Sequence, residues 1–331
     1  MAQGTRRQRH DQQRPSVFPT EETHATIHRA NAAESATARA GGGGETEAQN
    51  PLQYSNMKNV KHRLLFPMQA KGNVGKSLEI ATRACWLSER GIEWQGFDLD
   101  ADNRTLSRLF PGEVQLVPMT GRADDQDELV SVLKKVTAKP VTILDARAHL
   151  DGVLRSALQA TRFFNLAKQL NIGITVTMFP LDDVDVMTNL DELCQFCGNQ
   201  VEYIIVKNPA RAARTKMFDG SPLEDELKML GAVTITLPLL SEIVKMNLAF
   251  LESQHERGIP FNEAIGSDDL GLDIMARGML QHWTSEMFNQ YDRIAGRLLP
   301  TAEAEKIKPK AAPAMGETPR AKRGAKVNFA H

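Results

Sequence analysis

A short segment with two glycines, two lysines and a serine constrains the fold of this chain more than any other part of its sequence. It reads Ala70-Lys71-Gly72-Asn73-Val74-Gly75-Lys76-Ser77, after the apolar run 64–68 and before a helical pattern over 78–90. Glycines let backbone N–H groups turn inward around a phosphate, and the following helix presents its positive N-terminus to the same charge. In such a loop Lys76 reaches the outer phosphates and the Ser77 hydroxyl is a ligand of Mg²⁺. The segment therefore predicts a phosphate-binding loop between a buried strand and a helix.

The loop departs from the general pattern G-x-x-x-x-G-K-[ST] at its first position, which is Ala70, and carries a second lysine, Lys71. This resembles the deviant Walker A loop Lys-Gly-Gly-Val-Gly-Lys-Thr of the ParA/MinD family of dimerising ATPases. The resemblance implies that Lys71 reaches across a dimer interface to the nucleotide of the partner subunit, and that the nucleotide-binding residues are Lys71, Gly72, Asn73, Val74, Gly75, Lys76 and Ser77.

Asn73 stands where the family has its second glycine. Asparagine tolerates a positive φ better than most residues, so we expect the loop to form. The substitution should affect the rate of hydrolysis more than the binding of nucleotide.

Composition divides the chain of 331 residues into three parts. Residues 1–58 lack apolar periodicity and contain a run of four glycines at 41–44, which predicts a disordered N-terminal segment. Residues 300–331 are rich in lysine, alanine and proline, which predicts a disordered basic tail that either contacts an acidic partner or only aids solubility. Between them, residues 59–299 have the length of a single α/β domain.

Apolar runs alternate with helical patterns through this domain, which predicts a mostly parallel sheet with helices on both faces. The expected strands are Arg63–Met68, Glu93–Asp98, Glu113–Val117, Val141–Leu144, Ile172–Met178, Val201–Val206 and Val233–Leu237. The expected helices are Ser77–Arg90, Asp125–Val136, Gly152–Leu170, Asp182–Phe196, Pro222–Leu230, Leu239–Glu252 and Asp268–Leu299.

Carboxylates follow two of these strands, where the active residues of a parallel sheet gather. Asp98 and Asp100 end the second strand on the same side of it. They resemble the Asp-x-Asp segment of ParA/MinD proteins, which implies that Asp100 orients the attacking water and that Asp98 supports the magnesium shell. The alternative is a polar strand end, and we expect Asp102 to be a helix cap of this kind. Asp145 ends an apolar strand as a Walker B carboxylate does, which implies a magnesium ligand.

Asn208 follows the strand at 201–206 and precedes a proline. Its position resembles that of the family's base-recognition asparagine, whose amide pairs with the adenine edge. The alternative is a turn-forming Asn-Pro pair.

Other sequence features bear on where the protein is located and on what its C-terminal apolar residues contact. No stretch of 18 apolar residues is present, and the first 30 residues lack the apolar region of a secretory signal. The three cysteines are typical of a reducing compartment, so we expect a cytoplasmic protein with inert thiols. Apolar residues recur at helical spacing near the C-terminus and belong either to the core or to a partner surface: Leu280, Trp283, Met287, Tyr291, Ile294 and Leu298.

The resemblance implies a slow Mg²⁺-dependent ATPase that uses ATP to close a homodimer and hydrolysis to open it. Short strings such as Asp-Leu-Asp-Ala-Asp-Asn-Arg look most like plasmid-encoded ParA-like proteins of mobilisation, conjugal transfer or stability, with DNA or a DNA-bound protein as partner. Two alternatives remain, a nucleotide-dependent binding module with little turnover and a P-loop kinase. A kinase would need an arginine-rich lid, and Lys71 argues against it.

Overall fold

The computed structural model describes residues 59–122 and 124–307. The expected disordered segment 1–58 and the tail beyond residue 307 lie outside the described residues. Residues 300–307 pack against the domain predicted over 59–299. The N–H of Thr301 donates to the Val60 carbonyl, its hydroxyl accepts from the Val60 N–H, and Ile307 packs against the core.

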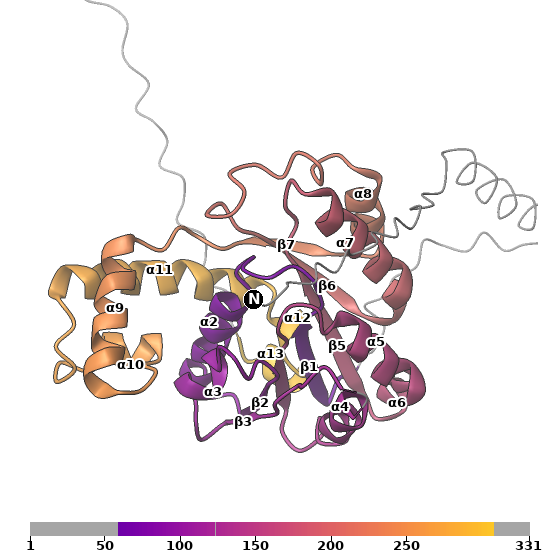
Figure 1. Ribbon diagram of the computed structural model, residues 1–331, viewed down its shortest axis with the longest axis horizontal. Coiled ribbons are helices and arrows are strands. Elements are labelled where there is room, and N and C mark those ends of the chain that lie inside the picture. The colour runs from indigo at the N-terminus through magenta and orange to yellow at the C-terminus, as the bar shows by residue number, and fades with distance from the viewer. Residues whose placement is uncertain (1–58, 123, 308–331) are drawn as a thin grey trace, which may run out of the picture. The chain divides into compact units, whose positions relative to one another are not determined.

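Seven parallel strands form one sheet in the order β3-β2-β4-β1-β5-β6-β7 (Figure 1). Each expected strand is present, with ends within one residue of those predicted. The strands are β1 His62–Pro67, β2 Trp94–Asp98, β3 Val114–Leu116, β4 Val141–Asp145, β5 Ile172–Met178, β6 Glu202–Lys207 and β7 Val233–Thr236.

Apolar side chains on β1 explain its central position. Leu64 and Leu65 point to opposite faces, as successive strand residues do, and both are fully buried. They belong to different core clusters, one on each face of the sheet. A strand buried on both faces needs continuous apolar residues, which is the pattern that identified it in the sequence.

Helices cover both faces of the sheet (Figure 1), and the predicted α/β class is confirmed. One face is covered by α2 Lys76–Glu89, α3 Thr105–Leu109, α9 Glu242–His255, α10 Phe261–Gly266, α11 Ile274–Arg293, α12 Ala295–Leu298 and α13 Thr301–Ala304. The other face is covered by α4 Asp125–Leu133, α5 Asp151–Ala160, α6 Phe163–Gln169, α7 Val184–Cys197 with its 3-10 turn Gly198–Gln200, and α8 Pro222–Met229.

Two expected helices are interrupted. The helix expected over 152–170 breaks at Arg162, whose φ of 48° leaves the right-handed helical region and separates α5 from α6. The helix expected over 268–299 begins only at Ile274 and breaks at Ile294, where the φ of −110° ends α11. Neither break contains a glycine or proline, so the sequence carried no conventional signal for them.

A buried polar network attaches α2 to α11. Glu79 and Arg83 form an ion pair at 2.6 Å and both are fully buried. The hydroxyl of Tyr291 donates to Glu79 Oε1 at 2.9 Å, and the indole N–H of Trp86 donates to Asp292 at 2.9 Å. The helix that follows the phosphate loop is thus fixed by charge-assisted hydrogen bonds as well as apolar packing.

The C-terminal apolar residues belong to the core. Leu280, Met287, Tyr291 and Leu298 are fully buried, and Trp283 is nearly so. All three thiols are buried as well. Burial raises the pKa of Cys85 to about 11 and those of Cys194 and Cys197 to about 12, so the expectation of inert thiols is confirmed. Over the described residues, the helices are too short or too polar to cross a membrane.

Candidate nucleotide-binding site

The glycine-rich loop lies at the carboxyl end of the central strand β1 and leads directly into α2. A parallel sheet with such a loop between a central strand and the next helix is the P-loop NTPase fold. Asn73 has a φ of 60°, as expected from its tolerance of the left-handed region. Gly75 has a φ of 109°, and a Cβ atom there would lie 2.5 Å from the side-chain nitrogen of Asn208. Gly75 is therefore required both by its backbone conformation and by this close approach.

Lys76 places its ammonium group inside the loop. The residue is only 6% exposed, and its Nζ donates to the backbone carbonyls of Lys71 at 2.7 Å and Gln69 at 3.2 Å. Burial lowers its pKa, which the carboxylates of Asp145 and Asp100 partly oppose. A buried cation held only by neutral carbonyls is poorly compensated, and a phosphate group would stabilise it far better.

Ser77 and Asp145 lie together at the edge of the same loop. The Ser77 hydroxyl donates to Asp145 Oδ1 at 3.4 Å. Burial, with the carboxylate of Asp98 nearby, raises the pKa of Asp145 to about 7. A hydroxyl and a carboxylate are the oxygen ligands that Mg²⁺ prefers, and the rest of its shell comes from phosphates and water in nucleotide sites. The donor set therefore fits Mg²⁺, although within residues 59–122 and 124–307 no three His, Cys, Asp or Glu side chains are grouped so that they alone could hold a metal ion.

Asp98 is fully buried and its carboxylate is held by three donors. Oδ1 accepts from the N–H of Asp100, and Oδ2 accepts from the N–H and hydroxyl of Ser107. It thereby satisfies a free N–H in the first turn of α3. The prediction that Asp102 caps this helix is wrong, because its side chain faces Arg147 at 3.5 Å and α3 begins at Thr105. A supporting role of Asp98 toward Mg²⁺ stays a prediction.

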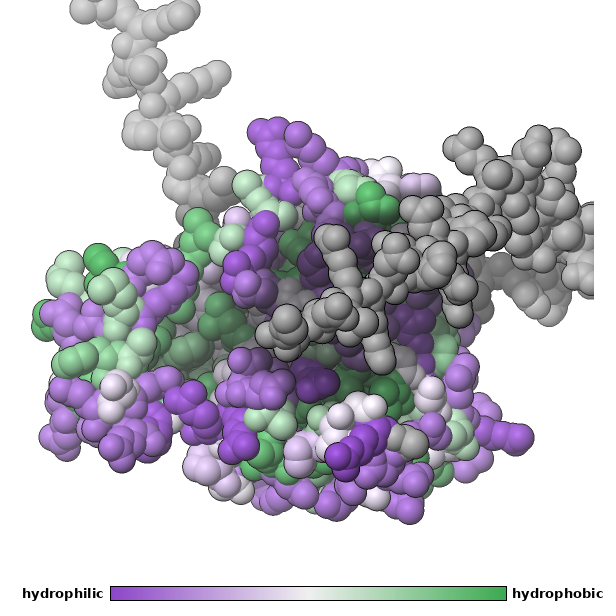
Figure 2. Space-filling view, in the orientation of Figure 1, coloured by the Kyte–Doolittle hydropathy of each residue, from purple (hydrophilic) through white to green (hydrophobic). Residues whose placement is uncertain are grey.

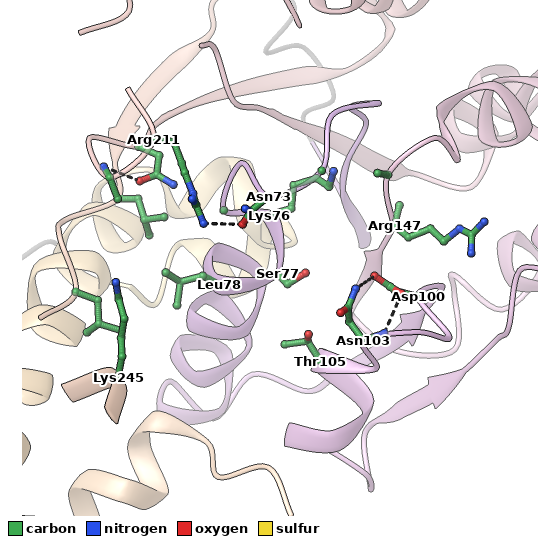
Figure 3. Close-up of a pocket in the computed structure, with 18 of the residues that line it drawn as sticks. Asn73, Lys76, Ser77, Leu78, Asp100, Asn103, Thr105, Arg147, Arg211 and Lys245 are labelled. Atoms are coloured by element: carbon green, nitrogen blue, oxygen red, sulfur yellow. Dashed lines mark hydrogen bonds between the residues drawn. The ribbon is translucent and has the colours of Figure 1, made fainter. Parts of the chain in front are cut away.

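Asp100 lies in the turn between β2 and α3. Its Oδ1 accepts from the N–H groups of Asp102 and Asn103, both at 3.1 Å, and its Oδ2 accepts from the Asn103 amide at 2.8 Å. Figure 3 shows Asp100 and Asn103 on one side of the cleft with Arg147, and Ser77 between them and Asn73. The turn fixes the Asp100 carboxylate at the rim of the cleft, and its role toward water stays a prediction.

Lys71 contacts its own chain at a carboxylate. Its Nζ lies 2.9 Å from Asp183 Oδ2, and half of the lysine side chain is exposed. Asp183 also caps α7, because its Oδ1 accepts from the N–H of Val186. The hydrogen bond and charge of Asp183 raise the pKa of Lys71. The side chain of the lysine that marks the sequence resemblance is therefore held at the start of α7, while its backbone carbonyl accepts from Lys76.

Asn208 braces the loop. Its amide nitrogen donates to the carbonyl of Val74 at 2.8 Å, and its Oδ1 accepts from the N–H of Ala210 at 3.1 Å. The residue is 5% exposed and lines the cleft, and each of its polar atoms keeps one further hydrogen-bonding position beyond these bonds. Base recognition by Asn208 stays a prediction.

Further residues that hold the loop by hydrogen bonds were not identified from the sequence. Asn189 of α7 accepts from the N–H of Ala70 at 3.2 Å, and the N–H of His149 donates to the Ala70 carbonyl at 3.2 Å. Gln69 exchanges two hydrogen bonds with the backbone of Phe179. Gln69 lies two residues after β1, and a polar residue directly after an apolar run was the one available signal.

These elements surround a cleft of about 1270 Å³. One wall contains the loop, the turn 208–211 and the start of α9, and the other contains segments 100–105 and 146–149. The volume is that of a small-molecule site and accommodates a nucleotide. Of the predicted site residues, Gly72, Asn73, Gly75, Lys76, Ser77, Asp100 and Asn208 line it, whereas Lys71, Val74, Asp98 and Asp145 are not among its lining residues.

No protein-family model matches this chain, and no curated protein matches it. Several solved structures resemble its fold at low identity. The MinD cell division protein of Aquifex aeolicus matches with 14% identity and a TM-score of 0.37 over 68% of this chain and 97% of that one. A plasmid partition protein from Borrelia burgdorferi matches with 13% identity and a TM-score of 0.34 over 52% and 97%.

The signal recognition particle receptor FtsY of Elizabethkingia anophelis matches with 11% identity and a TM-score of 0.38 over 80% of each chain. At such identities and TM-scores a likeness carries no argument about activity or partners. What this site can do follows from its own geometry.

Proposed function

We propose that this protein is an ATP-dependent switch that binds Mg²⁺ and ATP at the β1–α2 loop. The observation that carries the proposal is the buried Lys76 ammonium, whose hydrogen-bond partners are carbonyls of a loop that turns through positive φ at Asn73 and Gly75. Phosphoryl transfer depends on positioning and charge neutralisation, and both can come from residues at this cleft.

Each residue has a defined part in the proposed reaction. Lys76 and the loop N–H groups hold the outer phosphates, while Ser77 and Asp145 hold Mg²⁺. Bound Mg²⁺ neutralises charge on the phosphate oxygens. Asp100 orients the water that attacks the terminal phosphate, so ATP is converted to ADP and phosphate.

The switch itself is proposed to be a nucleotide-controlled homodimer. An exposed apolar surface beside the cleft supports it, and we call its residues the α9 stripe: Leu239, Ile243, Met246 and Phe250, which are 65%, 56%, 71% and 61% exposed. Leu239 also lines the cleft. Figure 2 shows apolar surface over the part of the molecule that contains α9 and the start of α11. Exposed apolar patches of this kind mark interaction sites.

Plasmid mobilisation, conjugal transfer or partition is the proposed setting, with DNA or a DNA-bound protein as partner and the cytoplasm as location. This rests on the resemblance of the short segments around Asp98 and Asn208. The alternative is a nucleotide-dependent binding module without turnover, which the hydrogen bonds that hold Asp100 in its own turn would suit.

Calorimetric titration with Mg²⁺ and ATP tests the proposal. The native protein should bind ATP, and Lys76→Ala should lose binding by a hundredfold or more because two or three phosphate charges lose their buried cation. Lys245→Ala is the matched control, since Lys245 lines the same cleft from α9 but is exposed and pairs with Glu242. Equal ATP affinity in the native protein and Lys76→Ala would contradict the proposal.

A further inference from the structure

Arg211 is a cation at the cleft that the reaction proposed above does not use. Its guanidinium donates to the side-chain oxygen of Asn73 at 2.5 Å, and its side chain is exposed (Figure 3). It lines the nucleotide cleft and also a neighbouring pocket. The ion pairs formed among the described residues do not include it.

The backbone of Arg211 is fixed relative to the phosphate loop. Its N–H donates to the carbonyl of Asn208 at 2.9 Å, and the side chain of the same Asn208 donates to the carbonyl of Val74 at 2.8 Å. One residue therefore ties the turn that carries Arg211 to the loop that carries Asn73. A change of acceptor by the guanidinium would therefore come from the exposed arginine side chain, on a turn whose backbone is anchored.

Asn73 is a weak hydrogen-bond acceptor for that guanidinium. The amide oxygen is neutral, and the contact is at the surface of the loop. A phosphate offers charged oxygens in the geometry that guanidinium matches with two parallel hydrogen bonds. A terminal phosphate bound at the loop would therefore compete successfully with Asn73 for Arg211.

We propose that Arg211 is a sensor of the terminal phosphate, which rests on the proposed function of the loop. With the cleft empty or holding a nucleoside diphosphate, Arg211 stays on Asn73. With a nucleoside triphosphate, it transfers to the outermost phosphate and leaves Asn73. Arg211 thus makes the cleft bind a nucleoside triphosphate more tightly than a nucleoside diphosphate.

The test is the ratio of ATP affinity to ADP affinity in matched variants. Arg211→Gln should weaken ATP binding about tenfold and ADP binding less than twofold. Arg211→Lys should recover part of the ratio, because the charge remains but the paired geometry is lost. Arg214→Gln is the control, since Arg214 lines only the neighbouring pocket, and it should leave the ratio unchanged.

Asn73→Gly separates sensing from a structural role. Glycine suits the positive φ and removes the resting partner, so ATP affinity should stay equal or increase while ADP affinity hardly changes. If the contact with Asn73 only stabilised the loop, Asn73→Gly and Arg211→Gln would weaken ATP and ADP alike, and the proposal would be overturned.

An unchanged ratio in Arg211→Gln, with tight binding of both nucleotides, would overturn the role of Arg211 alone. Failure of the native protein to bind either nucleotide would instead contradict the proposed function of the loop.

Discussion

At the scale of a residue, Asp145 shows the electrostatics of the proposed Mg²⁺ site. Its carboxyl group is buried at the end of β4, with the Ser77 hydroxyl as its neighbour. The charges closest to it include another carboxylate, Asp98, and the pKa of Asp145 is raised to about 7. A divalent cation at this point would reverse that shift by favouring the ionised form.

This pKa predicts a pH-dependent stability in the absence of nucleotide and metal. The pKa of Asp145 is near 3.8 in the unfolded chain and about 7 in the folded one, so its contribution to stability is full below pH 4 and lost as pH rises through 7. Asp145→Asn keeps a neutral side chain at every pH. Its Tm should therefore exceed that of the native protein by a gap that grows up to pH 7 and then levels.

The gap in Tm corresponds to about 1.4 kcal/mol of unfolding free energy for each unit by which the folded and unfolded pKa values of Asp145 differ. In all, this is several degrees of Tm. Thermal unfolding followed by circular dichroism between pH 4.5 and 8.5 measures it. A gap that stays constant with pH would show that Asp145 is ionised in the folded protein.

Asp100 carries the prediction about turnover. Asp100→Ala should leave ATP affinity within about threefold of the native value and lower kcat by a hundredfold or more, because orienting water matters in the transition state. Asp102→Ala, in the same turn but facing Arg147, should keep kcat near normal. Hydrolysis at the native rate by Asp100→Ala would move the water-orienting role to another residue.

At the scale of an element, α9 has an exposed apolar face. The α9 stripe is separated from the buried residues Val244, Leu248 and Leu251 of the same helix. It continues from the nucleotide cleft through Leu239. In the proposed switch, this apolar face is the surface that contacts the partner subunit.

We predict that Phe250→Glu weakens nucleotide-dependent dimerisation about tenfold or more, since a charge would be buried against apolar side chains. Met229→Glu is the matched control, because Met229 on α8 is 72% exposed and lies on the other side of the sheet. Light scattering with a slowly hydrolysed ATP analogue measures both. Equal dimerisation of Phe250→Glu and Met229→Glu would show that α9 is not part of the interface.

The sequence predicted where strands and helices lie better than it predicted which of their faces are buried or exposed. All seven strands were found because a continuous apolar run between two helical patterns is typical of a strand that is covered on both faces. The C-terminal stripe on α11 and the α9 stripe are both apolar at helical spacing, yet one is core and the other exposed. Periodicity identifies an apolar face but does not say what covers it, so this distinction needed the tertiary structure.

The same limit applies to the site. The glycines, Lys76 and Ser77 could be predicted as site residues because their chemistry is local to one loop. The partners of Lys71 and Asn208 are distant in sequence: Asp183 is 112 residues from Lys71, and Val74 is 134 residues from Asn208. Arg211 was overlooked for the same reason, since its contact with Asn73 spans 138 residues.

At the scale of the whole molecule, the proposed switch is a nucleotide-controlled association of two copies of this chain. Lys71 lies on Asp183 in the single chain, and the proposed dimer requires it to leave that carboxylate for the partner's nucleotide. The terminal phosphate adds the negative charge that makes this exchange favourable, and ADP lacks it. A charge-assisted hydrogen bond contributes about 1.5–3 kcal/mol, which at two symmetric sites is enough to control dimerisation.

Sedimentation velocity with Mg²⁺ and a slowly hydrolysed ATP analogue tests this claim most directly. We expect a dimer for the native protein with the analogue, a monomer with ADP, and a monomer for Lys71→Ala that still binds ATP. Asp183→Asn, which keeps an oxygen to cap α7 but loses the charge that holds Lys71, should dimerise at least as well as the native protein. A native protein that binds the analogue and sediments as a monomer in every nucleotide state would contradict the switch.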